Sequence, residues 1–197
     1  MKRWPIFIVT SLSILFVFSS CGYNKIQGLD EEVKASWSET QNQYQRRYDL
    51  IPNLVNTVKG YAKHEEGTLL AVTEARAKVG QMNIDKSVLN DAGKFKQFQE
   101  AQGQLSSALS RLMVVVEKYP DLKANENFRD LQAQLEGTEN RIAVARMRYI
   151  EAVKEYNKSV RFFPTNLTAK FLLHMDVKPN FELEDKKVKE APQVKFD

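Results

Sequence analysis

The sequence predicts an all-α protein, an antiparallel up-and-down bundle of three to four long helices with an extended C-terminal tail. Apolar residues recur at spacings of three and four over long stretches, which is the pattern of helices that bury one stripe. The chain has only 8 Gly and 6 Pro in 197 residues, too few for a fold rich in turns. Long amphipathic segments joined by short links form bundles, so this architecture is expected.

The first apolar segment lies at the N-terminus. Lys2 and Arg3 precede an apolar run of 13 residues, Ile6 to Phe18, and small residues then lead to Cys21, the only cysteine. This layout is typical of a secretory signal peptide, and the cysteine at its end indicates a bacterial lipoprotein signal. We predict a signal peptide at 1–20 and a lipid-anchored linker at 21–30. The Cys21 thiol carries the lipid, and palmitate is an expected acyl chain.

The competing interpretation of this segment is an uncleaved membrane helix. A span needs about 20 apolar residues, whereas this run has 13. Both interpretations place the rest of the chain in the cell envelope, on the non-cytoplasmic side of a bacterial membrane, with the periplasm as the expected compartment.

In the first half of the chain, apolar residues keep helical spacing from Ile26 to Tyr61, and this stretch contains one proline. Pro52 lies inside this pattern, so the helix either kinks there or restarts with Asp49 as its cap. The pattern continues to Gly80, a suitable C-terminal stop, with a break or bend expected near Gly67. Residues 81–94 are interpreted as a polar connection.

The second half of the chain contains two further stripes. One runs from Phe95 to Tyr119 and ends at Pro120. The other stripe lies in residues 126–163 and predicts one helix of about 55 Å, with Asn125 as its N-cap. A short helix near 166–174 completes a bundle domain at 31–175, and an extended tail follows at 176–197. The aromatic residues that keep helical spacing are assigned to the core: Trp37, Tyr44, Tyr149, Tyr156 and Phe163.

Composition limits the partners and the means of stabilisation. Without residues 1–20 the chain has 177 residues, enough for one core, and its formal charge falls from +4 to +2. Charges of both signs are mixed throughout, so no nucleic-acid partner is expected. A single cysteine forms no intrachain disulfide, so packing must stabilise the domain.

Several long runs resemble the signature of one bacterial protein family. They are Ala35-Ser36-Trp37, RRYDLIPNLV at 46–55, TVKGYAKHE at 57–65, Ala75-Arg76-Ala77, EKYPDLKAN at 117–125 and LEGTENRIA at 135–143. These runs resemble the LemA family over nearly all of the chain beyond the signal. The resemblance implies a helical bundle behind an N-terminal membrane anchor, in a family of poorly defined function with no catalytic residues to carry over. Members often have an uncleaved N-terminal helix, so the lipoprotein signal is a departure.

The densest polar motif is the candidate site. On a helix, Arg46, Asp49 and Asn53 share one face with Thr57, where a partner carboxylate or peptide could be clamped. The favoured interpretation is structural, because Arg47 falls on the apolar spacing and a buried arginine must be paired. The expected partner is an acidic residue of a neighbouring helix, such as Glu117 or Glu139. The full set of site residues is Arg46, Arg47, Asp49, Asn53, His64 and Glu65.

Metal and nucleophile chemistry find little support. Catalytic zinc needs three converging protein ligands, and the only histidine besides His64 is His174. We therefore expect no metal, no cofactor and no enzymatic activity. The predicted function is a membrane-tethered scaffold or adaptor for an unknown envelope protein. The alternative is an enzyme or ligand-binding protein with a site around Arg46 to Glu65.

Overall fold

The structure is a computed structural model that describes the backbone of residues 4–82 and 86–182, and the side chains of residues 22–82 and 87–182. The side chains of the predicted signal and of the predicted lipid site, Cys21, lie outside the described residues, as does the end of the predicted tail, 183–197. Among residues 22–82 and 87–182, whose side chains the structure describes, no helix has the length and apolar content needed to cross a membrane.

All regular structure in the described residues is helical, which confirms the predicted fold class. In chain order the elements are α1 (Trp4–Tyr61), α2 (Glu66–Gly80), η1 (Lys86–Asn90), α3 (Ala92–Val116), α4 (Pro120–Ala124), α5 (Glu126–Arg161), α6 (Thr165–Thr168) and η2 (Ala169–Leu173). Four helices are long, short helical pieces join α2 to α3 and α3 to α5, and two more follow α5.

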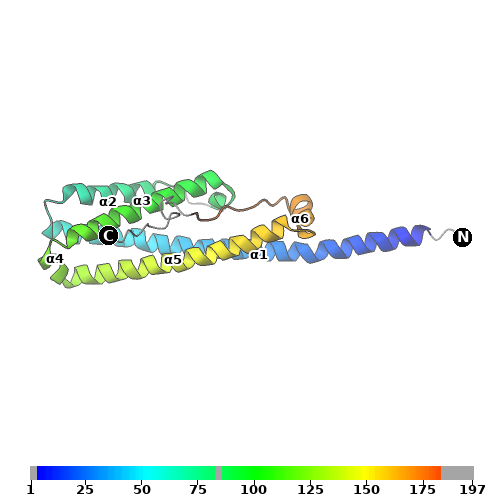
Figure 1. The fold of residues 1–197 in the computed structure, drawn as a ribbon, viewed down its shortest axis with the longest axis horizontal. Helices are drawn as coiled ribbons and strands as arrows, with labels where there is room; N and C mark the ends of the chain where they lie inside the picture. The colour runs from blue at the N-terminus through cyan, green and yellow to red at the C-terminus, as the bar shows by residue number, and fades with distance from the viewer. Residues whose placement is uncertain (1–3, 83–85, 183–197) are drawn as a thin grey trace, which may run out of the picture.

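The bundle has two different ends. The antiparallel helices α1 and α5 lie side by side, and α2 and α3 pack on each other over one part of them (Figure 1). We call the end with the α1–α2 turn and α4 the α4 end, and the opposite end, where α1 leaves the bundle, the α6 end (Figure 1).

Helix α1 is continuous through Pro52, so the expected restart with Asp49 as a cap is wrong. Asp49 is exposed and accepts a hydrogen bond from Gln45 Nε2 at 2.8 Å. The chain turns instead at residues 62–65, just before the predicted break, and α2 ends at Gly80 as predicted.

The second half follows the predicted pattern with one correction. Helix α5 covers the predicted range almost fully, and the Asn125 side chain caps it by accepting from the Phe128 N–H at 3.0 Å. The connection at 81–94 is more than a polar link, because η1 buries Val88 and Leu89 in the core. These two apolar residues stand next to each other, so they lack the helical spacing by which core positions were predicted.

Aromatic side chains fill the core near the α6 end. The Trp37 ring centroid lies 5.2 Å from that of Phe98 and 5.4 Å from that of Tyr149. Phe163 is the exception among the aromatic residues predicted to be buried, because it is 79% exposed beyond the end of α5.

The predicted linker and the predicted tail both pack against the bundle, in the parts of them that the structure describes. Residues 22–30, expected as part of a linker, lie in α1, and Ile26 and Asp30 are buried. Residues 176–182, expected as an extended tail, have no regular structure but pack back on α5. The Tyr149 hydroxyl donates to the Pro179 carbonyl at 3.0 Å, and the Tyr156 hydroxyl donates to the Asp176 carbonyl at 3.1 Å. Phe181 of this segment also packs its ring against Trp37, Phe95 and Tyr149.

Candidate functional site

Arg47 lies at the centre of the candidate site and joins three helices. Its side chain is 1% exposed, and its Nη1 donates to Glu139 Oε1 on α5 at 2.9 Å and to Ser106 Oγ on α3 at 2.6 Å. Its Nη2 donates to the side-chain oxygen of Gln102, also on α3. The sequence interpretation of Arg47 as a buried, paired residue agrees with these contacts. Of the two acids considered, Glu139 is the partner, and Glu117 pairs with Lys123 instead.

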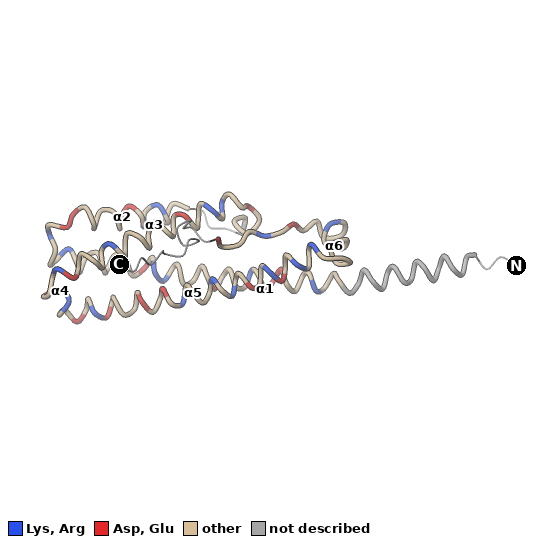
Figure 2. Tube along the Cα trace, viewed as in Figure 1, with Lys and Arg blue, Asp and Glu red and all other residues tan. Residues whose placement is uncertain are grey.

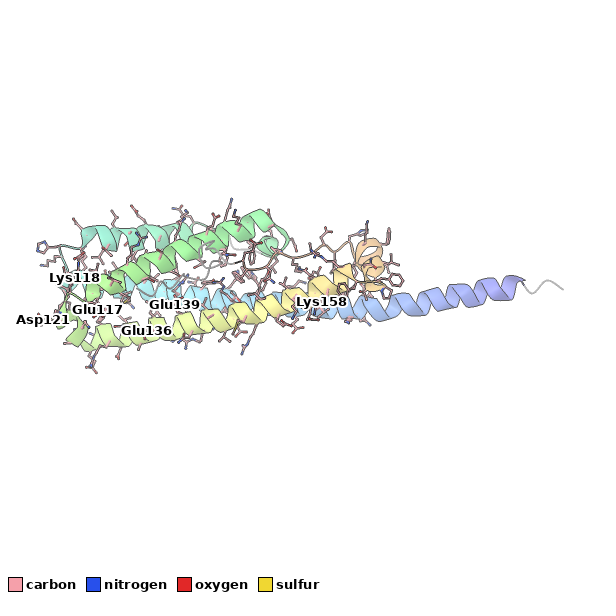
Figure 3. The ribbon with its side chains drawn as sticks, viewed as in Figure 1. Glu117, Lys118, Asp121, Glu136, Glu139 and Lys158 are labelled. Carbon is pink, nitrogen blue, oxygen red and sulfur yellow. The ribbon has the colours of Figure 1, made fainter. Side chains whose placement is uncertain are left out.

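The Arg47 contacts are those of an element that fixes the arrangement of helices. An arginine spreads its donors in a plane, so one side chain can satisfy acceptors on several helices at once. Glu139 is 41% exposed, which leaves one edge of the contact open to water. In Figure 3, Glu139 is labelled on α5 within the body of the bundle, away from the α6 end.

A small cavity of about 230 Å³ adjoins this cluster. Arg47 and Glu139 line it with residues that belong to α1, α3 and α5, among them Gln99 and Arg146. Ligand pockets usually measure about 300 to 1,000 Å³, so this one suits at most a small molecule or water. The Arg47 Nε is buried without a hydrogen-bond partner among the described residues.

The other candidate residues do not converge on Arg47. Arg46, Asp49 and Asn53 are exposed, as expected for a shared outer face of α1. His64 is exposed in the turn after α1. Glu65 accepts a hydrogen bond from the Tyr119 hydroxyl at 3.1 Å, and so ties this turn to the start of α4. No group of three His, Cys, Asp or Glu in the described residues is placed to hold a metal ion.

Two parts of the signature meet in a contact that the sequence did not suggest. Arg76 on α2 donates from Nε to the backbone carbonyl of Tyr48 at 3.2 Å, and its guanidinium carbon lies 3.8 Å from the centroid of the Tyr48 ring. The only signal for this contact is that Pro52 frees the carbonyl four residues before it.

A second buried polar centre lies toward the α6 end. The Nζ of Lys178 is 2.9 Å from Asp30 Oδ1, and both side chains are 6% exposed. Lys34 Nζ lies 2.8 Å from the other Asp30 oxygen. Burial by itself would raise the pKa of Asp30, but hydrogen bonds and attraction from Lys34 and Lys178 outweigh it and lower this pKa below its usual value.

Tyr156 belongs to the same centre. The Nζ of Lys178 lies 5.0 Å from the centroid of its ring. Burial, followed by the charges of Asp30 and Asp176, raises the pKa of Tyr156 to about 12. Sequence reasoning missed this centre, because Lys178 was assigned to the end of the chain beyond the bundle domain.

An open groove runs between α1 and α5 and has a volume of about 840 Å³. Small and apolar residues form part of its lining, including Leu29, Ala35 and Ala152. Two ion pairs join charged residues of the lining, one across the two helices and one along α5. Arg148 Nη1 contacts Glu39 at 2.6 Å, and Lys158 Nζ contacts Glu155 at 2.6 Å. The groove therefore offers an apolar strip between paired charges.

The fold and these contacts define an all-α bundle protein in which the main polar motif holds helices to one another. The chain belongs to the LemA family, whose family model matches residues 36–196. Magnetosome protein MamQ 2 of Paramagnetospirillum magneticum is 28% identical over 189 residues, covering 85% of this chain and 69% of that protein. Protein LemA of Metamycoplasma hominis is 23% identical over 167 residues, covering 85% of this chain and 72% of that protein.

Proposed function

We propose that this LemA family protein is a membrane-tethered, non-enzymatic scaffold or adaptor in the bacterial cell envelope, on the non-cytoplasmic side of the membrane. The tether is the lipid on Cys21, and the partner is an envelope protein that places a helix in the α1–α5 groove. The observation that carries this proposal is the groove itself, about 840 Å³ in volume and lined along two long helices.

The chemistry of the groove favours a helix as the bound element. An amphipathic helix lays its apolar face into a hydrophobic groove and uses side chains at spacings of three and four as anchors. Leu29, Ala35 and Ala152 provide a strip for such anchors. The flanking ion pairs, Arg148–Glu39 and Lys158–Glu155, can exchange partners with charges on the incoming helix.

The buried residue of the strongest polar motif, Arg47, bonds other helices of the same chain, which supports a structural role for the motif over a catalytic one. Arg47 uses both terminal nitrogens on α3 and α5. Asp49 and His64, which a site around Arg46 to Glu65 would recruit, are exposed and outside the lining of the cavity beside Arg47.

Photo-crosslinking in intact cells tests the groove as a binding surface. A photoreactive residue replaces Ala35, which lines the groove, or Ala77, an equally small and exposed position on α2. We expect one discrete protein adduct from Ala35 and its absence from Ala77, with the chain in the membrane fraction in both cases. The same adduct pattern from both positions, or none from Ala35, would contradict the groove as the partner site.

The second candidate function is binding of a small ligand beside Arg47. It is favoured by one observation, the cavity of about 230 Å³ next to the unpaired, buried Nε of that residue. A ligand there should raise the melting temperature of the native chain by binding only the folded state. A screen of small carboxylates and phosphates by thermal shift, with Arg47→Lys as the comparison, measures this.

A further inference from the structure

Large apolar side chains are concentrated on the surface at the α6 end. Five residues between 162 and 172 are 48% to 79% exposed. They come from the end of α5, from α6 and from η2, and they are Phe162, Phe163, Leu167, Phe171 and Leu172. We call these five residues the apolar end surface. Exposed apolar groups gathered at one place mark a site that contacts another apolar phase or molecule.

The segment that carries the apolar end surface has only basic charged residues, and Lys158 at its start pairs with Glu155 on the same helix. Residues 157–175 contain Lys158, Arg161 and Lys170 and no Asp or Glu. Arg161 and Lys170 are exposed, and the Lys170 Nζ lies 6.0 Å from the centroid of the Phe171 ring. Exposed apolar side chains next to exposed lysine and arginine are typical of surfaces that lie in the interface of a membrane with anionic lipids.

The position of this surface relative to the anchor identifies its occupant. Helix α6 lies beside α1 where α1 leaves the bundle (Figure 1). The contact is close at Gly22, since a Cβ placed there would lie 3.2 Å from Thr165 Cγ2. Cys21, the predicted lipid site, is the next residue toward the N-terminus, so no linker separates the anchor from the apolar end surface.

The charge distribution along the bundle distinguishes its two ends. Figure 2 shows basic and acidic residues mixed over the α4 end, and Figure 3 labels Glu117, Lys118 and Asp121 there and Lys158 toward the α6 end. Of the two ends, in the residues that the structure describes, the α6 end is the one with exposed Phe and Leu side chains. Its segment 157–175 carries basic residues and no acidic ones.

We propose that the apolar end surface inserts into the lipid interface of the membrane that anchors the chain. The proposal rests on the tether at Cys21 and adds a second, protein-based contact with the same bilayer. Phe163 and Phe171 enter the acyl-chain boundary, and Arg161 and Lys170 contact anionic head groups. Two contacts fix the orientation of the bundle, which projects α1 and α5 away from the membrane and holds the groove near its surface.

Photo-crosslinking to lipid tests the proposal with the full chain in its membrane. A photoreactive phenylalanine replaces Phe163 or Phe171, and Val114, 69% exposed near the C-terminal end of α3, serves as the control position. We expect phospholipid adducts by mass spectrometry from Phe163 and Phe171 and none above background from Val114. Phe163 also lines the groove, whereas Phe171 does not. Protein adducts in place of lipid adducts at both positions would show that a protein covers this surface and would overturn the proposal.

Fractionation of the cells shows whether a negative result concerns the lipid contact at Phe163 or the tether at Cys21. A chain that sediments with membranes but gives no lipid adduct at Phe163 overturns the lipid contact and leaves the tether intact. Recovery of the chain in the soluble fraction overturns both.

The charge requirement is tested in proteoliposomes that contain the same photoreactive chains. Lipid-adduct yield at Phe163 should be several-fold higher in vesicles of phosphatidylglycerol and phosphatidylcholine than in phosphatidylcholine alone. Arg161→Glu with Lys170→Glu should abolish that difference, because the basic groups that attract anionic head groups are gone. An equal yield in both lipids for the native sequence would overturn the assignment of the basic residues.

Discussion

Arg76 on α2 donates a hydrogen bond from its Nε to the backbone carbonyl of Tyr48 on α1, at 3.2 Å. That carbonyl lies four residues before Pro52, and a proline at this position has no N–H to offer it. The side chain from the next helix therefore satisfies the acceptor that the proline leaves open. This contact explains how α1 continues through Pro52 without an orphaned carbonyl, and it joins two of the signature runs in space.

The first prediction concerns the coupling between Arg76 and Pro52. Arg76→Ala removes the side-chain donor to the Tyr48 carbonyl and should lower the free energy of unfolding by about 1 to 2 kcal/mol. In a Pro52→Ala background the new N–H can bond the carbonyl, so the same change should cost clearly less. Urea denaturation of the two single variants and the double variant gives the coupling energy. Additive effects would contradict this role for Arg76.

The second prediction separates Arg47 from its neighbour. Arg47→Ala removes a buried guanidinium and leaves Glu139, Ser106 and Gln102 without it, and such losses cost about 3 to 5 kcal/mol. Because Glu139 is partly exposed, the lower part of that range is expected. Arg46→Ala is the matched control, and as an exposed substitution it should change stability by about 0.5 kcal/mol or less.

Melting temperature measures the Arg47 effect directly. Each kcal/mol corresponds to about 2 to 4 °C for a chain of this size. Similar small shifts for both arginine variants, together with loss of the groove adduct, would indicate instead that the pair acts in binding.

Local patterns in the sequence predicted the helices well, because each long helix buries a stripe at helical spacing. The predicted stripe over 126–163 and the Asn125 cap each depend on residues only three or four positions apart, and α5 forms close to the predicted range, ending at Arg161. Arg47 was identified for the same reason, since a charged residue on an apolar stripe must find a partner. Contacts that depend on the whole fold were harder to predict.

Two corrections show what the local pattern lacks. Lys178 follows the last helical segment, and only the folded chain brings it to Asp30. Phe163 keeps the spacing of the α5 stripe, but α5 ends at Arg161 and nothing in a repeat pattern reports where its partner surface stops. Burial depends on what lies opposite a residue, and the sequence pattern carries no such information.

The third prediction concerns the ion pair that fixes the C-terminal segment. Lys178→Met keeps most of the side-chain volume and removes the charge that faces Asp30. The expected loss is about 3 kcal/mol, the lower end for breaking a buried pair, because Lys34 still contacts Asp30. Lys154→Met is the control, since its pair with Glu151 is exposed to water and its loss should cost much less stability. Chemical denaturation measures both, and equal losses would contradict the buried role of Lys178.

The fourth prediction follows from the lowered pKa of Asp30. A carboxyl group with a lower pKa in the folded state stabilises the fold above its unfolded pKa, about 3.9, and loses this contribution as the pH falls through the folded value. The free energy of unfolding of the native chain should therefore fall below about pH 4, and Asp30→Asn should show a flatter curve over that interval. Lys178→Met, which keeps Lys34, should be intermediate. Unfolding curves measured from neutral to acidic pH decide this, and parallel curves for all three chains would count against it.

The last prediction tests the proposed anchor. Cys21→Ala removes the thiol that accepts the lipid, and signal peptidase II cuts only before a lipid-modified cysteine, so the variant should incorporate no palmitate and keep residues 1–20. Metabolic labelling with palmitate and the mass of the purified chain measure the two effects separately. Ser20→Ala is the control, because it keeps a small residue before the cysteine and should be labelled and cut like the native chain. Labelling of Cys21→Ala at the native level would contradict lipidation at this residue, and an uncut but equally membrane-bound native chain would favour the uncleaved helix as the anchor.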